Sequence, residues 1–448
     1  MGIWPKPSKL WRVLYLWAAL FAVPPAASPA TLSVHDLIGQ IRAHVLEQVR
    51  IGGNYMCIQT ADRHYFRPDE SARSGCDHPL KHPGKMTEVM TDRLRLDVAV
   101  SDNREIYSWY GQQHFNDGSI DQLITNGPIT SGGFGGFLRN IFLAAGIEFI
   151  YTGHSVVNGV PLDSFDYNVP LARSTYAIAA PQGSIIVPFN GSFTADSNTF
   201  ELTSLTVEVP KVSPGSNVCY ARSSIVYHMA HISGNDVLIP SHFDFKLEGI
   251  DHTVTDSQFD YRSCHAFTGE STISFKLDNT GASAVNSLQP IAKGPIRQGI
   301  NFFVQLRTPI DDRDSYTGDP VEGVLLHDMK LRHARDVIPK GSLVRGIITQ
   351  LEFHRGENPY YLLDISFNQI VEGNITYTMR ATHLSTPGDA VFSPQLGGRR
   401  GRGLVASQSS MAGPTPAPLQ EMGSHFHLNS GYTSEWTTTR VKSEPAGE

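Results

Sequence analysis

Four cysteines are the residues of this chain whose type and spacing most clearly predict chemistry. They are Cys57, Cys76, Cys219 and Cys264 in a sequence of 448 residues. A zinc site built from cysteines needs close Cys-x-x-Cys pairs, and the sequence contains none. An even number of widely spaced cysteines is typical of disulfides in an exported protein, and four cysteines permit three pairings. We favour Cys57 with Cys76 and Cys219 with Cys264, because each pair flanks a predicted hairpin; buried free thiols are the alternative.

Histidines and aspartates cluster in two places without the spacing of a metal site. His228 and His231 are three residues apart in a predicted strand, where that spacing puts their side chains on opposite faces. Oxygen ligands of the kind that calcium prefers are grouped in one loop at Asp311, Asp312, Asp314 and Asp319. This loop has Tyr316 where an EF-hand has Asp or Asn, and it lacks the bidentate Glu. We expect no metal site, and we expect the aspartates to be solvated turn residues.

The sequence predicts no catalytic residue and no cofactor. Gly153-His154-Ser155-Val156-Val157 lacks the second glycine of a nucleophile elbow. The glycine-rich run from Gly132 to Gly136 is not followed by the Lys-Ser/Thr pair of a phosphate loop. We therefore expect a protein that is not an enzyme. A hydrolase of the cell envelope is an alternative without a supporting motif.

The first thirty residues have the organisation of a secretory signal peptide. Lys6, Lys9 and Arg12 precede an apolar run from Val13 to Val23, and small residues follow before Thr31. This run is about eleven residues long, whereas a membrane-spanning helix needs roughly 20. We expect cleavage before Thr31 and a periplasmic or secreted product; an uncleaved anchor is the alternative. The net charge of -7 and a pI near 6.2 argue against a nucleic-acid partner.

The elements that must position these residues are mostly strands. A helix is predicted over Val34 to Val49, where apolar residues recur at helical spacing before Gly52 and Gly53. Period-two alternation, as in Leu94 to Val100, predicts a strand. Further predicted strands in this first part of the chain are Asn54 to Phe66, Glu105 to Tyr110, Ile147 to Ser155, Val160 to Val169, Thr175 to Ala179, Ile185 to Phe193, Phe200 to Val209, Ile225 to Ile232, His242 to Ile250, Gln258 to Cys264 and Ser271 to Leu277.

The fold predicted from this pattern is mainly β with few helices. We expect a curved antiparallel half-barrel with helices, followed by a small β-barrel domain that avoids exposed strand edges. The predicted divisions are a signal peptide at 1–30, the half-barrel at 31–280, a linker at 281–298, the small barrel at 299–384, a disordered insertion at 385–423, and a terminal hairpin and tail at 424–448.

One predicted helix inside the meander has an aromatic face. Its apolar residues recur at helical spacing after the glycine-rich run, and they are the candidates for lining a ligand groove: Phe134, Phe137, Leu138, Ile141 and Phe142. The glycines could act as a hinge, which would make this helix a movable lid over the groove. The alternative is a close-packing corner and a fixed core helix.

The first part of the chain resembles the outer-membrane lipoprotein carrier family. The resemblance depends on the order of elements between Thr31 and Leu277 and on segments such as Asp92-Arg93-Leu94-Arg95-Leu96-Asp97-Val98. In that family, a curved half-barrel wraps over helices, and its apolar concave face holds acyl chains. The resemblance therefore implies lipid or an acylated protein as the ligand.

The second part is similar to the C-terminal β-barrel of conjugation-type secretion channel proteins. The segments that carry this similarity lie between Gly299 and Val371: Leu306-Arg307-Thr308-Pro309-Ile310-Asp311, Gly318-Asp319-Pro320-Val321 and Ile338-Pro339-Lys340-Gly341-Ser342-Leu343-Val344-Arg345-Gly346. In that family the barrel is an assembly element, so the similarity implies an envelope protein partner for this domain. The function expected from both parts is an exported, non-enzymatic envelope protein with an apolar ligand groove. The alternative is a purely structural or assembly module without a ligand.

Overall fold

The structure is a computed structural model of the chain. It describes residues 33–51, 54–71, 73–78, 80–101, 104–112, 115, 118–180, 183–210, 215–266, 291–331, 337–385 and 415–440. Several predictions lie outside these residues: the signal peptide, the strand from Ser271 to Leu277, residues 281–290 of the linker, residues 386–414 of the insertion and the tail after residue 440.

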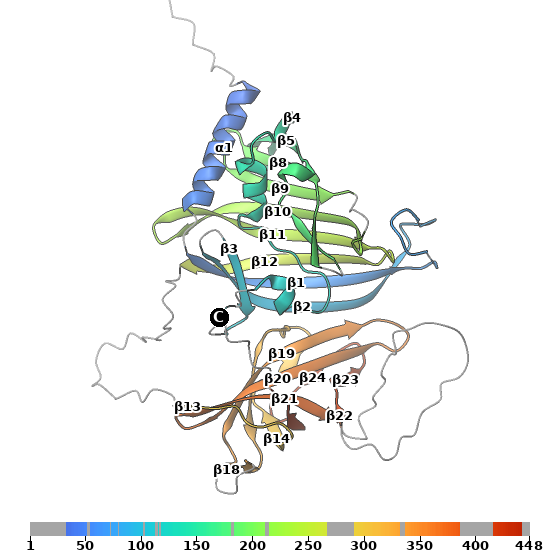
Figure 1. Cartoon of the computed structure of the whole chain (residues 1–448), viewed down its shortest axis with the longest axis vertical. Coiled ribbons are helices and arrows are strands. Elements are labelled where there is room, and N and C mark those ends of the chain that lie inside the picture. Colours follow the sequence, from blue (N-terminus) through green and yellow to red (C-terminus); the bar gives the residue numbers. More distant parts are fainter. Residues whose placement is uncertain are drawn as a thin grey trace, which may run out of the picture.

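The fold class predicted from the sequence is confirmed. The chain forms a curved antiparallel sheet with a few helices, followed by a small barrel (Figure 1). Helix α1 (Val34–Ile51) begins with Ser33, whose hydroxyl caps the backbone N–H of Asp36 at 3.2 Å. Its buried stripe of Leu37, Ile41 and Val45 belongs to the same core as the sheet. Among the described residues, no helix combines the length and the apolar character needed to cross a membrane.

The N-terminal sheet is antiparallel throughout. Its strand order is β4-β5-β8-β9-β10-β11-β12-β1-β2-β3. The strands are β1 (Tyr55–Pro68), β2 (Met86–Ser101), β3 (Arg104–Trp109), β4 (Glu148–Val157), β5 (Val160–Val169), β8 (Phe189–Asp196), β9 (Leu202–Val209), β10 (Val218–Ile232), β11 (Asn235–Gly249) and β12 (Val254–Ala266). Neighbouring strands follow one another in the chain, except that β5 pairs with β8 across β6 and β7 and that β12 returns to pair with β1. The last strand thus lies beside the first.

One predicted strand is divided in the structure. The sequence predicted a single strand from Ile185 to Phe193, but the chain forms β7 (Gly183–Ile186) and then β8. Pro188 lies between them, and a proline has no N–H to donate to a ladder. Strand β7 pairs with β6 (Ala177–Ala180) in a separate two-stranded sheet.

Short helical segments lie over one face of the N-terminal sheet. They are α2 (Ile120–Leu123), α3 (Gly136–Leu138), the π-helix η1 (Arg139–Leu143) and the 3-10 helix η2 (Leu171–Arg173). The aromatic helix predicted from the sequence therefore begins after Phe134 and continues as a π-helix. Figure 1 shows helical turns of this part of the chain in front of the strands.

The C-terminal barrel is a closed antiparallel ring. Its strand order is β14-β16-β19-β20-β21-β25, and β25 returns to β14. The ring strands are β14 (Asn301–Leu306), β16 (Pro320–Leu325), β19 (Leu343–His354), β20 (Tyr360–Glu372), β21 (Ile375–Ser385) and β25 (Thr433–Thr438). Trp436 on β25 is buried against Phe367 and His383. Closure leaves the ring without a free edge.

Shorter strands attach to this ring or pair beside it. They are β13 (Ile291–Lys293), β15 (Ile310–Asp311), β17 (Met329–Lys330), β18 (Val337–Ile338), β22 (Thr415–Pro416), β23 (Leu419–Met422) and β24 (His427–Leu428). The sequence predicted a terminal hairpin. In the structure β24 pairs with β15, whereas β25 pairs with β14 and β21. The end of the chain thus completes the ring instead of folding on itself; the other predicted division points stay predictions.

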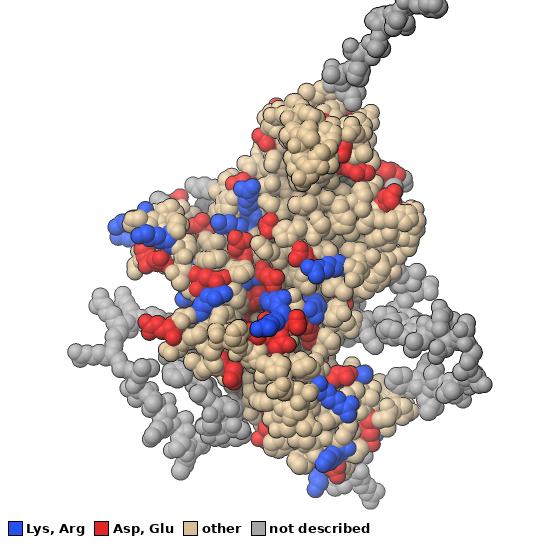
Figure 2. All heavy atoms as spheres, turned by 180° about the vertical axis from the view of Figure 1, so that it is seen from behind, with Lys and Arg blue, Asp and Glu red and all other residues tan. Residues whose placement is uncertain are grey.

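Strand β2 joins the N-terminal sheet to the barrel. At one end it pairs with β19, where Asp92 lies opposite Glu352. A parallel bridge also joins Leu94 to Thr317, with backbone hydrogen bonds on both sides of it. Charged residues gather in a band across the middle of the face that Figure 2 shows. At the junction, Arg95 pairs with Asp319 at 2.9 Å. The two units are therefore connected by backbone pairing and by ion pairs.

A buried ion pair lies beneath this junction. The guanidinium of Arg63 on β1 donates two hydrogen bonds to the carboxylate of Asp92 on β2, at 2.7 and 2.5 Å. Both side chains are almost fully buried, with 1% and 4% of their surface exposed. Arg63 donates a third hydrogen bond to the carbonyl of Pro128 at 3.1 Å, and Tyr65 also reaches Asp92. The pair thus connects the sheet to the inner segment around residue 128.

Both disulfides differ from the favoured pairing. Cys57 is bonded to Cys264 and Cys76 to Cys219. The physical reason is the strand order: β12 pairs with β1, so Cys57 and Cys264 lie on neighbouring strands with their Cα atoms 4.1 Å apart. The local pairing that we favoured is therefore wrong, because it assumed that each cysteine would pair within its own hairpin.

Peptide mapping checks this connectivity. Digestion of the unreduced protein should release one linked peptide pair that contains Cys57 and Cys264, and a second that contains Cys76 and Cys219. Mass spectrometry before and after reduction identifies both pairs. A linked peptide containing Cys57 and Cys76 would contradict the strand order described above.

Removal of one partner of the buried ion pair should be costly. Arg63→Met leaves the Asp92 carboxylate buried without its counter-charge, which should lower the free energy of unfolding by about 3–5 kcal/mol in urea titrations. The double variant Arg63→Met, Asp92→Leu should lose less, because no charge remains. The control Arg345→Met breaks an exposed pair with Glu322 and should cost about 0–1 kcal/mol. Equal losses for Arg63→Met and the control would contradict the structural role of the pair.

Candidate functional site

The N-terminal unit contains a large cavity. It has a volume of about 1240 Å³ and lies between the inner face of β10 and β11 and segments that cross that face, residues 119–140, 175–178 and 183–184. Small-molecule sites commonly measure about 300–1,000 Å³, so this space is large enough for a ligand. The cavity is the candidate functional site.

Apolar side chains line the cavity from both sides, among polar ones. Ala221 on β10 and Phe245 on β11 point inward from the sheet, and both are buried. Ile120, Ile124 and Ile178 come from the crossing segments and are also buried. These side chains reach one space because alternate residues of a strand share a face, whereas the crossing segments are brought over that face by the tertiary structure.

The predicted groove residues lie close together in the core, but only some reach a cavity. Phe137 lines the large cavity and packs edge to face on Tyr176 at 5.2 Å. Phe134 and Leu138 line a neighbouring cavity of about 20 Å³. Ile141 and Phe142 are fully buried, as expected for fixed core residues. That all five form the wall of a ligand groove stays a prediction.

A carboxylate holds the glycine-rich run in place. Glu105 on β3 accepts the backbone N–H of Gly132 at 2.7 Å and that of Phe134 at 3.0 Å. Its carboxylate also accepts the hydroxyl of Tyr107 at 2.6 Å. The carbonyl of Gly133 accepts the hydroxyl of Tyr227 on β10 at 2.8 Å. These bonds tie the run to the sheet, which favours the close-packing alternative over a hinge.

Close approach explains one glycine of the cavity wall. A Cβ atom on Gly127 would lie 2.0 Å from the hydroxyl of Tyr65, and the backbone has a φ of +73°. Any side chain here would push the segment away from Tyr65 and from the buried Arg63. Because Gly127 has no side chain, this segment of the cavity wall packs directly against Tyr65 and Arg63 of β1.

Polar groups lie among the apolar ones in the cavity. Burial raises the pKa of Tyr176 to about 12, and a hydrogen bond with Thr130 acts in the opposite direction. Tyr176 therefore stays a neutral phenol at physiological pH. The amide of Asn140 donates to the carbonyl of Gly136 at 3.1 Å and accepts from the N–H and hydroxyl of Thr175.

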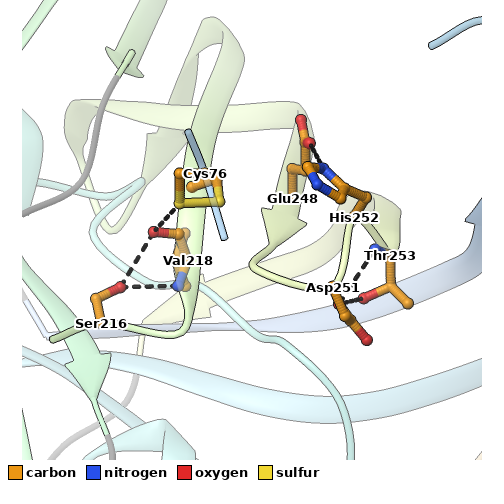
Figure 3. Close-up of a disulfide and its surroundings, with 8 residues drawn as sticks. Cys76, Ser216, Val218, Glu248, Asp251, His252 and Thr253 are labelled. Carbon is orange, nitrogen blue, oxygen red and sulfur yellow. Dashed lines mark hydrogen bonds and ion pairs between the residues drawn. A yellow bond between two sulfur atoms is a disulfide. The ribbon is translucent and has the colours of Figure 1, made fainter. Parts of the chain in front are cut away.

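The second disulfide lies at the edge of the cavity. Cys76 comes from the long β1–β2 connection, and Gly75 beside it donates its N–H to the carbonyl of Ile250 at 2.7 Å. Figure 3 shows Cys76 next to Val218 and Ser216, with Asp251 and Thr253 on the adjoining turn. The hydroxyl of Ser216 accepts the N–H of Val218 at 2.8 Å. This disulfide therefore fixes the connection against the start of β10.

The residue clusters considered for metal binding are separated or engaged with other partners. His231 pairs with Asp236 at 2.9 Å, and His228 is exposed. Asp319 pairs with Arg95, whereas Asp312 bonds to His425 at 3.2 Å. In the part of the chain that the structure describes, no group of three or more His, Cys, Asp or Glu residues could hold a metal ion.

Sequence reasoning missed most of the cavity. Its wall is built from α2, the segment around Thr130, the β6–β7 hairpin, the start of β10, the end of β11 and the turn that follows β11. These pieces are far apart in the sequence, and only their apolar character is visible there. Glu105 was also missed, since one acidic residue in a predicted strand carries no signal of its partners.

The effect of Glu105 on the cavity wall can be measured. Glu105→Ala removes an ionised acceptor from two backbone N–H groups and should lower the free energy of unfolding by about 1.5–3 kcal/mol. Amide hydrogen exchange at Gly132 and Phe134 should become faster. Glu148→Ala, at an exposed position of β4, is the control and should change neither quantity. Unchanged exchange in Glu105→Ala would argue against this anchoring.

Comparisons with known proteins do not establish a family for this chain. No protein-family model matches the sequence, and no curated protein does. Among solved structures, the chain is similar to a DUF1329 family protein from Desulfovibrio piger, with 9% identity over 53% of this chain and 95% of that chain, and a TM-score of 0.26. It is similar to a LolA superfamily protein from Nitrosomonas europaea (8% identity, 51% and 94% covered, TM-score 0.24). It is also similar to the Mycobacterium tuberculosis lipoprotein LppX (9% identity, 51% and 95% covered, TM-score 0.19). These TM-scores are too low to establish a family, so both resemblances seen in the sequence stay predictions.

Proposed function

We propose that this protein is an exported envelope protein that binds an amphiphilic ligand, a lipid or the acyl part of a lipoprotein, in the cavity of its N-terminal unit. The observation that carries the proposal is the cavity of about 1240 Å³, which apolar side chains line from both sides. An apolar chain placed there would leave water for contact with Phe137, Ile178 and Ala221. Burial of apolar surface contributes roughly 25 cal/mol per Å² to the free energy of binding, so contact between an acyl chain and these side chains would stabilise the complex.

Export is part of the proposal and has separate support. The structure contains two disulfides, which form and persist in oxidising compartments. The organisation of residues 1–30 agrees with such a compartment. A protein partner that docks on the C-terminal barrel stays a prediction, since only its closed ring is described.

Mass spectrometry tests the ligand directly. Protein purified from its native compartment should carry a lipid that appears in organic extracts and in native mass spectra as an added mass. Protein unfolded, extracted and refolded should lack this mass and regain it when lipid is added. Absence of bound lipid in the first sample and of uptake in the second would contradict the proposal.

A substitution inside the cavity should block binding without unfolding the protein. Ala221→Trp directs a large ring from β10 into the cavity, so an apolar fluorescent probe should lose at least about tenfold in affinity, equivalent to 1.4 kcal/mol. The melting temperature should change little, because the ring enters empty space. Val226→Trp, at a half-exposed position of the same strand, is the control and should bind the probe normally. Normal binding by Ala221→Trp would show that the probe binds elsewhere.

A further inference from the structure

Arg139 is a half-buried cation that faces the cavity. It is the first residue of the π-helix η1, and it lines both the large cavity and the small one beside it. Phe137, two residues earlier, lines the same large cavity. Both residues line the large cavity, and a Cβ atom on Gly135, which lines the small cavity, would lie 3.0 Å from Nη1 of Arg139.

The guanidinium of Arg139 has no partner among the described residues. No hydrogen bond, ion pair or ring contact joins its side chain to another described residue. Three arginines of β1 and β2 are paired: Arg63 with Asp92, Arg93 with Asp62 and Arg95 with Asp319. A guanidinium carries five N–H donors and stays charged at every physiological pH. Its donors are therefore free to bind an anion.

The carboxylates around the two cavities are exposed or bonded to groups other than Arg139. Glu105 lines the small cavity with Arg139, but its oxygens accept the N–H groups of Gly132 and Phe134. Asp121 and Asp251 line the large cavity, yet both are exposed to solvent, and Asp251 bonds to its neighbour Thr253. The half-buried charge that faces the cavity is therefore positive.

The position of Arg139 is fixed by the residue that follows it. Asn140 bonds at one end to the carbonyl of Gly136 and at the other to Thr175. These bonds hold the first turn of η1 against the segment that leads to β6. The backbone that carries Arg139 is thereby fixed, whereas the guanidinium itself is held by no bond to a described residue.

We propose that the ligand is an anionic single-chain amphiphile, whose carboxylate pairs with Arg139 while its chain lies along Phe137, Ile178 and Ala221. This inference rests on the proposed function, since it requires that the cavity holds an apolar chain. Arg139 would favour ligands whose head group is negatively charged. A carboxylate suits this site because a guanidinium binds its two oxygens with two parallel hydrogen bonds.

Competition between matched ligands tests the head group. A long-chain fatty acid and the alcohol with the same chain are compared as competitors of an apolar fluorescent probe, at a pH where the acid is ionised. The wild-type protein should bind the acid roughly tenfold more tightly than the alcohol. Acetate has the carboxylate without the chain, and it should not displace the probe.

Three variants assign the preference to Arg139. Arg139→Met should bind the acid and the alcohol equally, with the affinity for the alcohol unchanged. Arg139→Lys should keep part of the preference, because the positive charge remains. Arg222→Met removes an exposed arginine of β10 that does not line the cavity, and it should behave as wild type. Circular dichroism confirms that each variant is folded.

The outcomes separate this inference from the proposed function. Equal binding of acid and alcohol by the wild type, or a preference that survives in Arg139→Met, overturns the role of Arg139 and leaves the cavity as a lipid site. Displacement of the probe by acetate overturns the amphiphile in favour of a small-anion site. Binding of neither long-chain ligand overturns the proposed function as well.

Discussion

The ion pair between Arg63 and Asp92 is the interaction on which the arrangement of this protein depends. Both charges are buried, and such burial costs several kcal/mol for each ion unless the geometry is complete. Here two short hydrogen bonds join the pair, and a third connects Arg63 to Pro128 in the cavity wall. Burial raises the pKa of the Asp92 carboxyl, and the guanidinium of Arg63 acts in the opposite direction. The ion pair is therefore stable only when the N-terminal sheet, the cavity wall around Pro128 and the pairing of β2 with β19 are all formed.

The surroundings of Asp92 also determine how the N-terminal sheet contacts the C-terminal barrel. Asp92 lies opposite Glu352 of the barrel strand β19, and Glu352 bonds to His354 at 3.1 Å. Beside it, Arg95 binds Asp319, and its guanidinium lies 4.0 Å from the ring centre of Tyr316. Backbone pairing between β2 and β19 sets the orientation of the barrel relative to the N-terminal sheet. The ion pair between Arg95 and Asp319 sets which residues lie opposite each other. A barrel without Asp319 would leave Arg95 of β2 without its ion-pair partner.

The pairing of β12 with β1 brings cysteines that are far apart in the chain close enough to form a disulfide. The Cys57–Cys264 disulfide closes a loop of sequence separation 207, and the Cys76–Cys219 disulfide spans 143. Bonds across such long loops remove many conformations from the unfolded chain. The first also joins the neighbouring strands β1 and β12, and the second joins the β1–β2 connection to β10. The arginines at the junction are paired, whereas Arg139, which lines the cavity, has no ion-pair partner among the described residues.

The sequence by itself determined the class of the fold, most strands and the presence of α1. Period-two alternation predicts strands such as β5, and helical spacing predicts α1, because each pattern depends only on neighbouring residues. Phe137 was also found as a cavity residue from its spacing. The tertiary structure alone decided the disulfide pairing, the return of β12 to β1, the strand β25 that closes the barrel, and the cavity with Arg139. Each of these joins residues that are far apart in the chain, and local patterns carry no information about such contacts.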